Sequence, residues 1–276
     1  PLKHTIWLRL ILSISAAILV TRCGRIPPTA VSPPAPKVVE SIGLSPYALE
    51  THENEIKITA YNVENLFDAT HDEGKEDYTF LPKGYPGKAE YCRRLSVPAY
   101  RRECENTDWT QEKLNMRLGL LARAISKQGD LPDLLAVEEI ENSNVARQLA
   151  AALGYAHFAI SNSPDVRGID NALFYKTDKL RPLGAPEEIE LQGPLFATSK
   201  TRNILRMKFS VVQGPRDAVV EVFVNHWPSQ GSPTEKRMAA ARALQEAIQQ
   251  ESEKHGSNYF PIAVGDFNTL VQEHPN

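Results

Sequence analysis

The stretch YFPIAVGDFN, residues 259–268, organises the rest of the chain. Its apolar, β-branched run up to Gly265 predicts a buried strand. Asp266 and Asn268 follow, and an acid and an amide two residues apart leave an extended strand on one side. Both could therefore address one phosphate or one attacking water. The alternative is a strand-to-turn junction in which Asp266 caps the next segment and Asn268 closes the turn, and this stretch alone favours that alternative.

Composition is that of a globular protein with a large core. The chain has 276 residues, of which 42% are hydrophobic and 24% charged, and we expect one globular domain. The formal net charge of -3 argues against broad attraction to nucleic acid but leaves room for a local basic cleft. The sequence begins at Pro1 and ends at Asn276, just after the organising strand, and we expect both ends to be cut.

The N-terminal region predicts export. Basic residues precede an apolar run, residues 10–20, which suits the hydrophobic part of an export signal, so we interpret residues 1–23 as a signal sequence. The segment ILVTRCG, ending with Cys23 and Gly24, resembles the lipobox of bacterial lipoproteins, although Arg22 departs from that pattern. Lipidation of Cys23 and ordinary cleavage nearby remain alternatives. Residues 24–55 are rich in proline and predict an extended tether to a domain over residues 56–276.

Two further strands are predicted to end in acids and amides. In EIKITAYNVENLFD, residues 55–68, strand period places Asn62 and Glu64 on a common face, where they could coordinate a hard cation or form a polar loop. In DLPDLLAVEEIEN, residues 130–142, an apolar strand ends in Glu138, Glu139 and Glu141. Because successive strand residues face opposite sides, only one of Glu138 and Glu139 should face a cleft. A solvated strand end is the alternative.

Polar residues also flank the later strands. AHFAI and NALFYK predict strands joined by the loop SNSPDVRGID, and Asp170 stands before the second as a turn residue or a substrate contact. Arg202 begins another strand, where it could grip phosphate or form a surface salt bridge. His226 ends the strongly alternating strand of AVVEVFVNHWPSQG, a position that favours chemistry over a satisfied core histidine.

Helix signals separate some of these strands. A leucine-rich face predicts a helix from Asp108 or Thr110 to about residue 128, and a second runs from Asn142 or Ser143 to residue 153. The third is predicted to begin with a capping box, formed by the segment SPTE over residues 232–235, and to end near residue 254.

The region between Ala69 and Asp108 is rich in Gly, Pro, Tyr and charge without sustained periodicity, so we predict a long surface excursion. In an exported protein, Cys92 and Cys104 are expected to form a disulfide worth about 3 kcal/mol. A metal pair is the weaker alternative, because His71 is the only nearby histidine. Several basic and aromatic residues could either line a nucleic-acid groove or merely solvate the loop: Arg93, Arg94, Arg101, Arg102, Tyr91 and Tyr100.

Four of these motifs together resemble the endonuclease/exonuclease/phosphatase superfamily, which is DNase I-like. They are YNVENLF, AVEEIEN, VNHWPSQ and VGDFN, in the family's order and spacing. The resemblance implies an α/β fold, a four-layer sandwich of two packed mixed β-sheets flanked by helices, with the final strands missing here. It also implies metal-assisted hydrolysis of a phosphoester, normally with Mg²⁺.

The resemblance also assigns site residues by position. Asn62 and Glu139 look like the metal-site residues, with Glu64 as a helper and Glu138 in a place usually held by glutamine or another polar residue. Asp170 and Arg202 are the candidate substrate contacts.

For catalysis, His226 resembles the histidine that contacts the scissile phosphate. Asp266 looks like the residue that orients or activates water, and Asn268 like its phosphate-binding companion. The family ends with a Ser-Asp-His motif that this sequence lacks, and His274 lies too close to the organising strand to replace it. We therefore expect a fragment of a longer protein, an inactive incomplete domain being the alternative.

The resulting expectation is an exported, metal-dependent phosphodiesterase, endonuclease-like, in the cell envelope or secreted. Its partner is a phosphodiester substrate such as nucleic acid, it contacts a membrane only through a lipid on Cys23, and it is monomeric. Two alternatives remain open. One is a surface-anchored binding protein that keeps the fold without turnover, and the other is a phosphatase acting on small or lipid phosphoesters.

Overall fold

The computed structural model describes residues 55–127 and 129–270. The predicted signal sequence, Cys23, the tether up to residue 54 and His274 lie outside the described residues. Within the described ranges, no helix combines the length and apolar character needed to cross a bilayer.

Two mixed β-sheets form the centre of the molecule. The first has the order β1-β2-β4-β3, with β1 parallel to β2 and the other pairs antiparallel. The second has the order β5-β7-β8-β9, with β6 also paired to β7 and with β8 parallel to β9. The strands of the first sheet are β1 (Ile58–Leu66), β2 (Leu134–Ile140), β3 (His157–Ile160) and β4 (Asp170–Tyr175). Those of the second are β5 (Leu180–Pro182), β6 (Glu187–Ile189), β7 (Ile204–Val211), β8 (Val219–His226) and β9 (Tyr259–Asp266).

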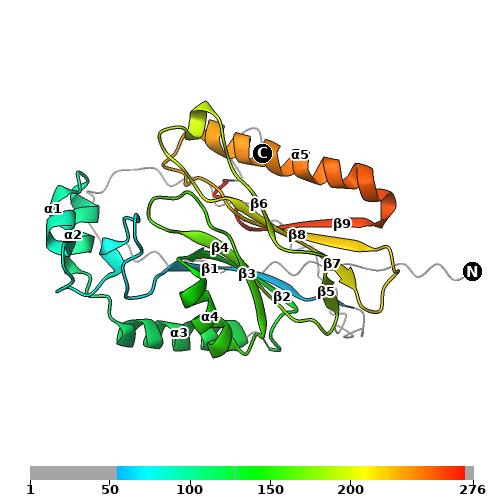
Figure 1. The fold of residues 1–276 in the computed structure, drawn as a ribbon, viewed down its shortest axis with the longest axis horizontal. Coiled ribbons are helices and arrows are strands. Elements are labelled where there is room, and N and C mark those ends of the chain that lie inside the picture. The colour runs from blue at the N-terminus through cyan, green and yellow to red at the C-terminus, as the bar shows by residue number, and fades with distance from the viewer. Residues whose placement is uncertain (1–54, 128, 271–276) are drawn as a thin grey trace, which may run out of the picture.

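Helices cover the outer faces of both sheets, as Figure 1 shows. The first sheet carries α3 (Gln111–Ser126) and α4 (Ser143–Leu153), and the second carries α5 (Thr234–His255). The predicted four-layer sandwich of two packed mixed sheets flanked by helices is therefore confirmed.

The alternation of side chains along β2 shows how the layers are held together. Leu134 and Ala136 pack into the core between the two sheets, whereas Leu135 and Val137 pack against α3 and α4. All four are fully buried. A strand covered on both faces reads as a continuous apolar run, and burial of such side chains is the main favourable contribution to folding.

The helix starts agree with the sequence signals in two cases out of three. The Oγ1 atom of Thr110 accepts a hydrogen bond from the N–H of Lys113 at 3.3 Å, and Asn142 caps α4 through its side-chain oxygen. The predicted capping box of α5 is wrong. Pro233 is the N-cap residue, its extended ψ of 138° delays the first helical turn to Thr234, and its side chain makes no capping hydrogen bond.

The excursion between β1 and α3 is more regular than predicted. It contains η1 (Tyr78–Phe80), α1 (Lys88–Arg94) and α2 (Pro98–Asn106), and we call residues 88–106 the helical hairpin. Helices of seven and nine residues are too short to display a clear apolar period and are marginal on their own. Tertiary contacts must therefore stabilise them.

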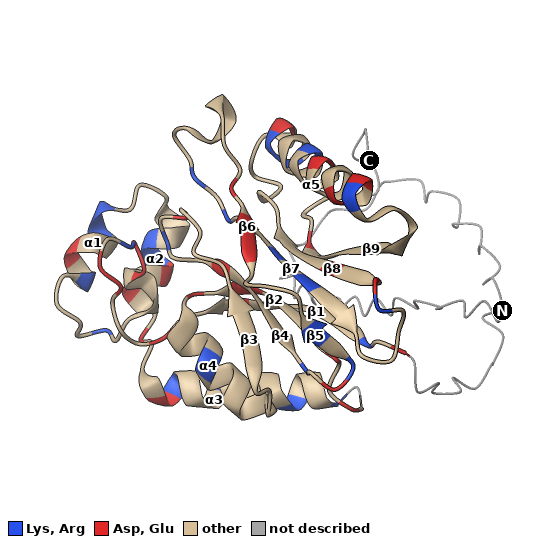
Figure 2. Cartoon of the chain, turned by 45° about the vertical axis from the view of Figure 1, so that its right-hand side comes forward, with Lys and Arg blue, Asp and Glu red and all other residues tan. Residues whose placement is uncertain are grey.

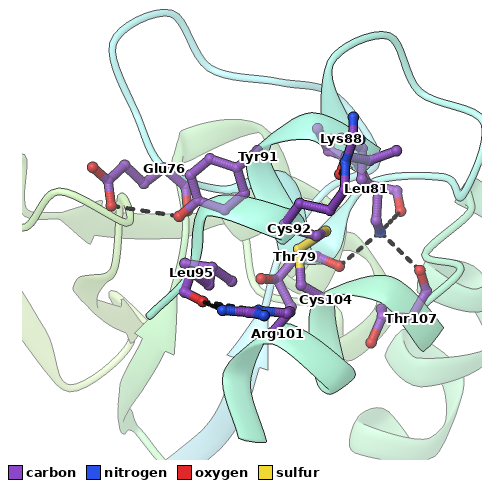
Figure 3. Close-up of a disulfide and its surroundings, with 12 residues drawn as sticks. Glu76, Thr79, Leu81, Lys88, Tyr91, Cys92, Leu95, Arg101, Cys104 and Thr107 are labelled. Carbon is purple, nitrogen blue, oxygen red and sulfur yellow. Dashed lines mark hydrogen bonds between the residues drawn. A yellow bond between two sulfur atoms is a disulfide. The ribbon is translucent and has the colours of Figure 1, made fainter. Parts of the chain in front are cut away.

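Two contacts hold the helical hairpin in place (Figure 3). Cys92 and Cys104 form a disulfide with a Cα–Cα distance of 5.5 Å, so the predicted pairing is confirmed. The buried Nζ of Lys88 donates hydrogen bonds to three carbonyl oxygens, at 3.0, 2.5 and 2.7 Å, from Thr79, Leu81 and Thr107. Burial lowers the pKa of Lys88 to about 8.

Removing the disulfide should destabilise the protein. A Cys92→Ser, Cys104→Ser double variant is expected to lose up to about 3 kcal/mol of unfolding free energy, because the unfolded chain regains the entropy of the closed loop. Chemical denaturation of the oxidised protein and of the variant measures the difference. Reductant should lower the stability of the parent protein and leave the variant unchanged. Equal stability of the two oxidised proteins would contradict the expectation.

Candidate active site

Four strand ends bring the predicted site residues together. The Nδ2 atom of Asn62 donates to Glu139 Oε1 at 3.1 Å and to Asp266 Oδ2 at 3.3 Å. The Nε2 atom of His226 lies 3.6 Å from Glu139 Oε1. These residues come from β1, β2, β8 and β9, and Asn62 and Asp266 are 204 positions apart in the chain. The structure thus places the four side chains in one site, while their catalytic roles remain predictions.

Strand pairing explains this convergence. The parallel pairs β1–β2 and β8–β9 place Asn62 opposite Glu138 and His226 opposite Asp266. The carboxyl ends of parallel strands lie at the same edge of a sheet, which is where ligand sites form in α/β folds. Because the two sheets pack face to face, the two pairs of strand ends meet.

A β-bulge in β2 orients Glu139. Its φ angle is +65°, and the pairing of β2 shifts register between Glu138 and Ile140. The Oε2 atom of Glu139 accepts a hydrogen bond from the N–H of Asn65 at 2.9 Å. Simple strand alternation predicted that only one of Glu138 and Glu139 would face the site. Of the two, Glu139 makes the contacts with Asn62 and His226, while Glu138 is buried.

Backbone strain is concentrated at this site. In the ranges that the structure describes, four residues other than glycine have positive φ: Glu64, Asn65, Glu139 and Asn268, at 57°, 58°, 65° and 51°. All four lie at or beside the converging strand ends. Such conformations cost energy and persist where surrounding contacts hold them, which occurs frequently at functional sites.

Gly265 allows β8 and β9 to approach each other next to the site. Its φ is +122°, and a Cβ at this position would lie 2.0 Å from the carbonyl oxygen of Asn225. Asn225 in turn donates to the carbonyl oxygen of Val264 at 3.2 Å and accepts from Trp227 Nε1 at 3.0 Å. Glycine at this position is therefore what sets His226 beside Asp266.

His226 is a neutral imidazole at neutral pH. Burial lowers its pKa well below the ordinary value, and the guanidinium groups of Arg202 and Arg167 add to this effect. Its 3.6 Å approach to Glu139 is therefore a contact between a neutral ring and a carboxylate, not an ion pair. Its Nδ1 atom is buried and has no hydrogen-bond partner among the described residues.

Glu138 is a buried acidic group to which the sequence analysis gave no catalytic or metal-binding role. It is 1% exposed, and its Oε1 atom has no hydrogen-bond partner within the described ranges. Burial raises its pKa to about 8, and the charges of Asp266 and Glu139 contribute in the same direction. The site therefore holds three carboxyl groups close enough to repel one another when ionised.

This donor set fits a hard cation. Carboxylate and amide oxygens are the ligands of Mg²⁺, which keeps several waters and needs only one or two protein carboxylates. In the described part of the chain, no group of three or more His, Cys, Asp or Glu side chains is arranged to hold a metal ion by itself. Glu139 is 19% exposed and reachable, and the unpartnered oxygen of Glu138 lies on the same acidic cluster.

Arg202 lies next to this cluster and is buried. Its Nη2 atom donates to the carbonyl oxygen of Trp227 at 2.7 Å, and its Nη1 atom lies 3.7 Å from Asp165 Oδ2. Its Nε atom has no partner among the described residues. Asp165 also pairs with Arg167 at 3.4 Å. The sequence analysis assigned no role to Asp165 or Arg167, although the run of polar residues between two predicted strands could have indicated them.

Asp170 and Asn268 occupy different positions relative to the site. The Oδ1 atom of buried Asp170 accepts hydrogen bonds from Ser161 Oγ and the Ser163 N–H, both at 2.7 Å, so it braces the loop before β4. The substrate contact predicted for Asp170 stays a prediction, because these hydrogen bonds join it to the loop and not to the four converging residues. The N–H of Asn268 donates to Asp266 Oδ1 at 2.9 Å. The strand-to-turn junction predicted as the alternative for residues 259–268 is therefore present as well.

A cleft of about 550 Å³ lies beside the site. Asn65 and Arg202 line it, as do Tyr91 and Tyr100 of the helical hairpin, whereas Asn62, Glu139, His226 and Asp266 do not. Of the basic residues predicted to form a groove, Arg94 instead pairs with Glu90 on the hairpin surface.

The chain belongs to the endonuclease/exonuclease/phosphatase family. Its residues 98–274 match the model of that family, which is more than half of the chain. The fold described above is accordingly a phosphoesterase fold. Among curated proteins, no match was found.

Solved structures share part of the fold. An endonuclease/exonuclease/phosphatase family protein from Bacteroides thetaiotaomicron is 17% identical, with a TM-score of 0.43, and the match covers 56% of this chain and 55% of that one. The human Nocturnin catalytic domain is 20% identical, with a TM-score of 0.43 and coverage of 56% and 57%. ANGEL2, described as a 2',3'-cyclic phosphatase, is 20% identical, with a TM-score of 0.47 and coverage of 57% and 45%. The chain thus spans less than two thirds of each, and a likeness of this degree does not extend to activity.

Substituting Gly265 should disrupt the site and the fold together. A Gly265→Ala variant is expected to lose about 3 kcal/mol of unfolding free energy, because its Cβ collides with the backbone of Asn225 and its φ is unfavourable for alanine. Thermal or chemical denaturation measures the loss. Gly119→Ala is the matched control, since a Cβ there meets nothing within 4 Å, and helix α3 should be unchanged or stabilised by about 0.5–1 kcal/mol. Similar stability of both variants would contradict the close approach of β8 and β9.

Proposed function

We propose that this protein is a divalent-metal-dependent phosphodiesterase, endonuclease-like in its reaction, and that Mg²⁺ is its metal. The observation that carries the proposal is the convergence of Asn62, Glu139, His226 and Asp266 at one end of the paired sheets. Membership of the endonuclease/exonuclease/phosphatase family supports the same reaction class.

The metal would be held by Glu139, together with the side-chain oxygen of Asn62. When bound, such a cation neutralises phosphate oxygens and stabilises the charge that develops during hydrolysis. The chain's own residues prepare for this, because the Asn65 N–H fixes one oxygen of Glu139 and the Asn62 amide fixes the other.

Asp266 is placed to orient the attacking water. The Asn268 N–H holds its Oδ1 atom and the Asn62 amide holds its Oδ2 atom, so the carboxylate cannot rotate away from the site. A carboxylate held in this way accepts a hydrogen bond from water and aligns it toward phosphorus.

His226 and Arg202 supply the donors for the phosphate. The neutral imidazole of His226 can donate one N–H to a phosphate oxygen without repelling Arg202. Arg202 carries a buried Nε–H that no described residue uses, and guanidinium groups bind phosphate through paired hydrogen bonds. Donors in a water-poor site stabilise developing charge effectively.

Export and anchoring form part of the proposal. The basic and apolar pattern of residues 1–23 supports an export signal, and the lipobox-like segment supports a lipid on Cys23, with cleavage nearby as the alternative. The disulfide between Cys92 and Cys104 agrees with an oxidising compartment.

Substituting the site residues should abolish hydrolysis. In the full-length protein with Mg²⁺, Glu139→Gln and His226→Ala are expected to reduce kcat on plasmid DNA and on bis-p-nitrophenyl phosphate by on the order of 10²–10⁴-fold, because each removes a charge or a donor from the transition state. Chelation by EDTA should remove activity, and Mg²⁺ should restore it.

A matched control tests the assignment. Glu112→Gln makes the same chemical change on the exposed face of α3 and should retain full activity. Circular dichroism should confirm that all variants fold. Undiminished activity in Glu139→Gln and His226→Ala would refute the assigned site. Absence of metal-dependent hydrolysis in the parent protein would instead favour a binding protein that keeps the fold without turnover.

A further inference from the structure

The cleft beside the active site has two unlike walls. One is the helical hairpin, which contributes Tyr91, Leu95 and Tyr100. The other is formed by residues 199–202 and by the segment that leads into α5, including Lys236. Asn65 and Arg202 are among its lining residues, and the N–H of Asn65 is hydrogen-bonded to Glu139, so the cleft adjoins the site.

Aromatic rings line the hairpin side and the inner surface of the cleft. Phe67 and Phe80 are stacked, with ring centroids 4.3 Å apart, and both line it. Tyr91 also lines it and is stacked on Tyr78 at 4.8 Å, which fixes the plane of its ring. Tyr100 is 62% exposed and stacks on no other ring in the described part of the chain. Its ring face is therefore available to a ligand.

Four cations line the cleft, Arg167, Lys200, Arg202 and Lys236, whereas the arginines of the helical hairpin do not. Arg101, for example, turns back to donate two hydrogen bonds to the carbonyl oxygen of Leu95 (Figure 3). Three carboxylates, of Glu76, Glu103 and Asp165, line the cleft as well. Arg167 pairs with Asp165 at 3.4 Å and the exposed Lys200 with Glu190 at 3.6 Å, so a phosphate would share these cations with carboxylates. Figure 2 likewise shows acidic and basic residues mixed on α1 and α2. Rings on one wall and cations on the other match a ligand with a planar ring and a phosphate.

The size of the cleft limits what can enter. A volume of about 550 Å³ is typical of a site for a small molecule or for one piece of a polymer. In a duplex the bases are stacked inside and present only their edges in the grooves. A tyrosine face can therefore stack on a base only where the base is unpaired.

We propose that this cleft is a subsite for one unpaired nucleotide next to the scissile phosphate. The base stacks on Tyr100 beside Tyr91, and the adjoining backbone phosphate lies against Arg167 and Lys200. The protein would then select single-stranded over double-stranded nucleic acid. The inference rests on the proposed function for the position of the scissile phosphate, but the stacking subsite can be tested without catalysis.

The helical hairpin is built to hold this subsite rigid. The disulfide joins its two helices, and the buried ammonium group of Lys88 ties α1 to the carbonyl oxygens of Thr79, Leu81 and Thr107 (Figure 3). The ring of Tyr91 is fixed by its stacking on Tyr78, and the helix that carries Tyr100 is held by the disulfide, so little conformational entropy is lost when a base binds there.

Fluorescence anisotropy in EDTA, at low salt, tests the subsite while cleavage is blocked. The probes are a fluorescein-labelled single-stranded oligothymidylate, the same oligonucleotide with abasic tetrahydrofuran residues, and a duplex of equal length.

Stacking contributes enough that Tyr100→Ala should weaken binding of oligothymidylate about tenfold, whereas Tyr100→Phe should retain it. The abasic strand should bind the parent protein and Tyr100→Ala equally, and the duplex should bind the parent protein more weakly than the single strand. Met116→Ala removes an exposed side chain from α3, outside the cleft, and should leave the binding of all three probes unchanged.

Three results would overturn the proposal. The first is unchanged binding of oligothymidylate by Tyr100→Ala, and the second is equal binding of abasic and base-containing strands by the parent protein. The third is that the protein binds no oligonucleotide but sediments with phosphatidylcholine vesicles in a manner that depends on Tyr100. Hydrolysis of bis-p-nitrophenyl phosphate separates this from the proposed function. Activity without Tyr100-dependent binding refutes only the subsite, and Tyr100-dependent binding without any metal-dependent hydrolysis refutes only the enzyme.

Discussion

The side-chain amide of Asn62 joins the two halves of the site. Its Nδ2 atom donates to Glu139 on the first sheet and to Asp266 on the second. Two carboxylates facing each other across a partly buried gap repel, and a shared donor offsets part of that repulsion. Burial, together with the charges of Asp266 and Glu139, raises the pKa of the neighbouring Glu138 to about 8. The packing of the sheets therefore creates a place that a cation would stabilise.

A buried cation, Arg202, lies close to the acidic cluster without pairing with it. Arg202 is buried against Asp165 and the carbonyl oxygen of Trp227, so its guanidinium is balanced without neutralising the acidic cluster. Its charge in turn helps to keep His226 neutral. An acidic side that suits a metal and a cationic side that suits phosphate thus lie next to each other, which is the arrangement that phosphoester hydrolysis requires.

The helical hairpin extends this arrangement beyond the reacting centre. It belongs to neither sheet. Its disulfide and the three hydrogen bonds of Lys88 hold it beside the cleft. Loops that carry recognition residues on a rigid scaffold are a general way to add specificity to a shared fold.

The sequence by itself determined seven of the nine described strands, two of the three predicted helix starts, the disulfide pairing and four residues that meet at the site. These depend on local periodicity, on capping chemistry and on polar residues placed at strand ends, all of which are visible along the chain. Only the tertiary structure decided that a bulge turns Glu139 beside Glu138, that Asp165 and Arg167 join the site, that Asp170 braces a loop, and that the excursion folds into α1 and α2. The physical reason is that those features are stabilised by contacts between segments remote in sequence, such as the Lys88 hydrogen bonds, which leave no periodic pattern in the segments themselves.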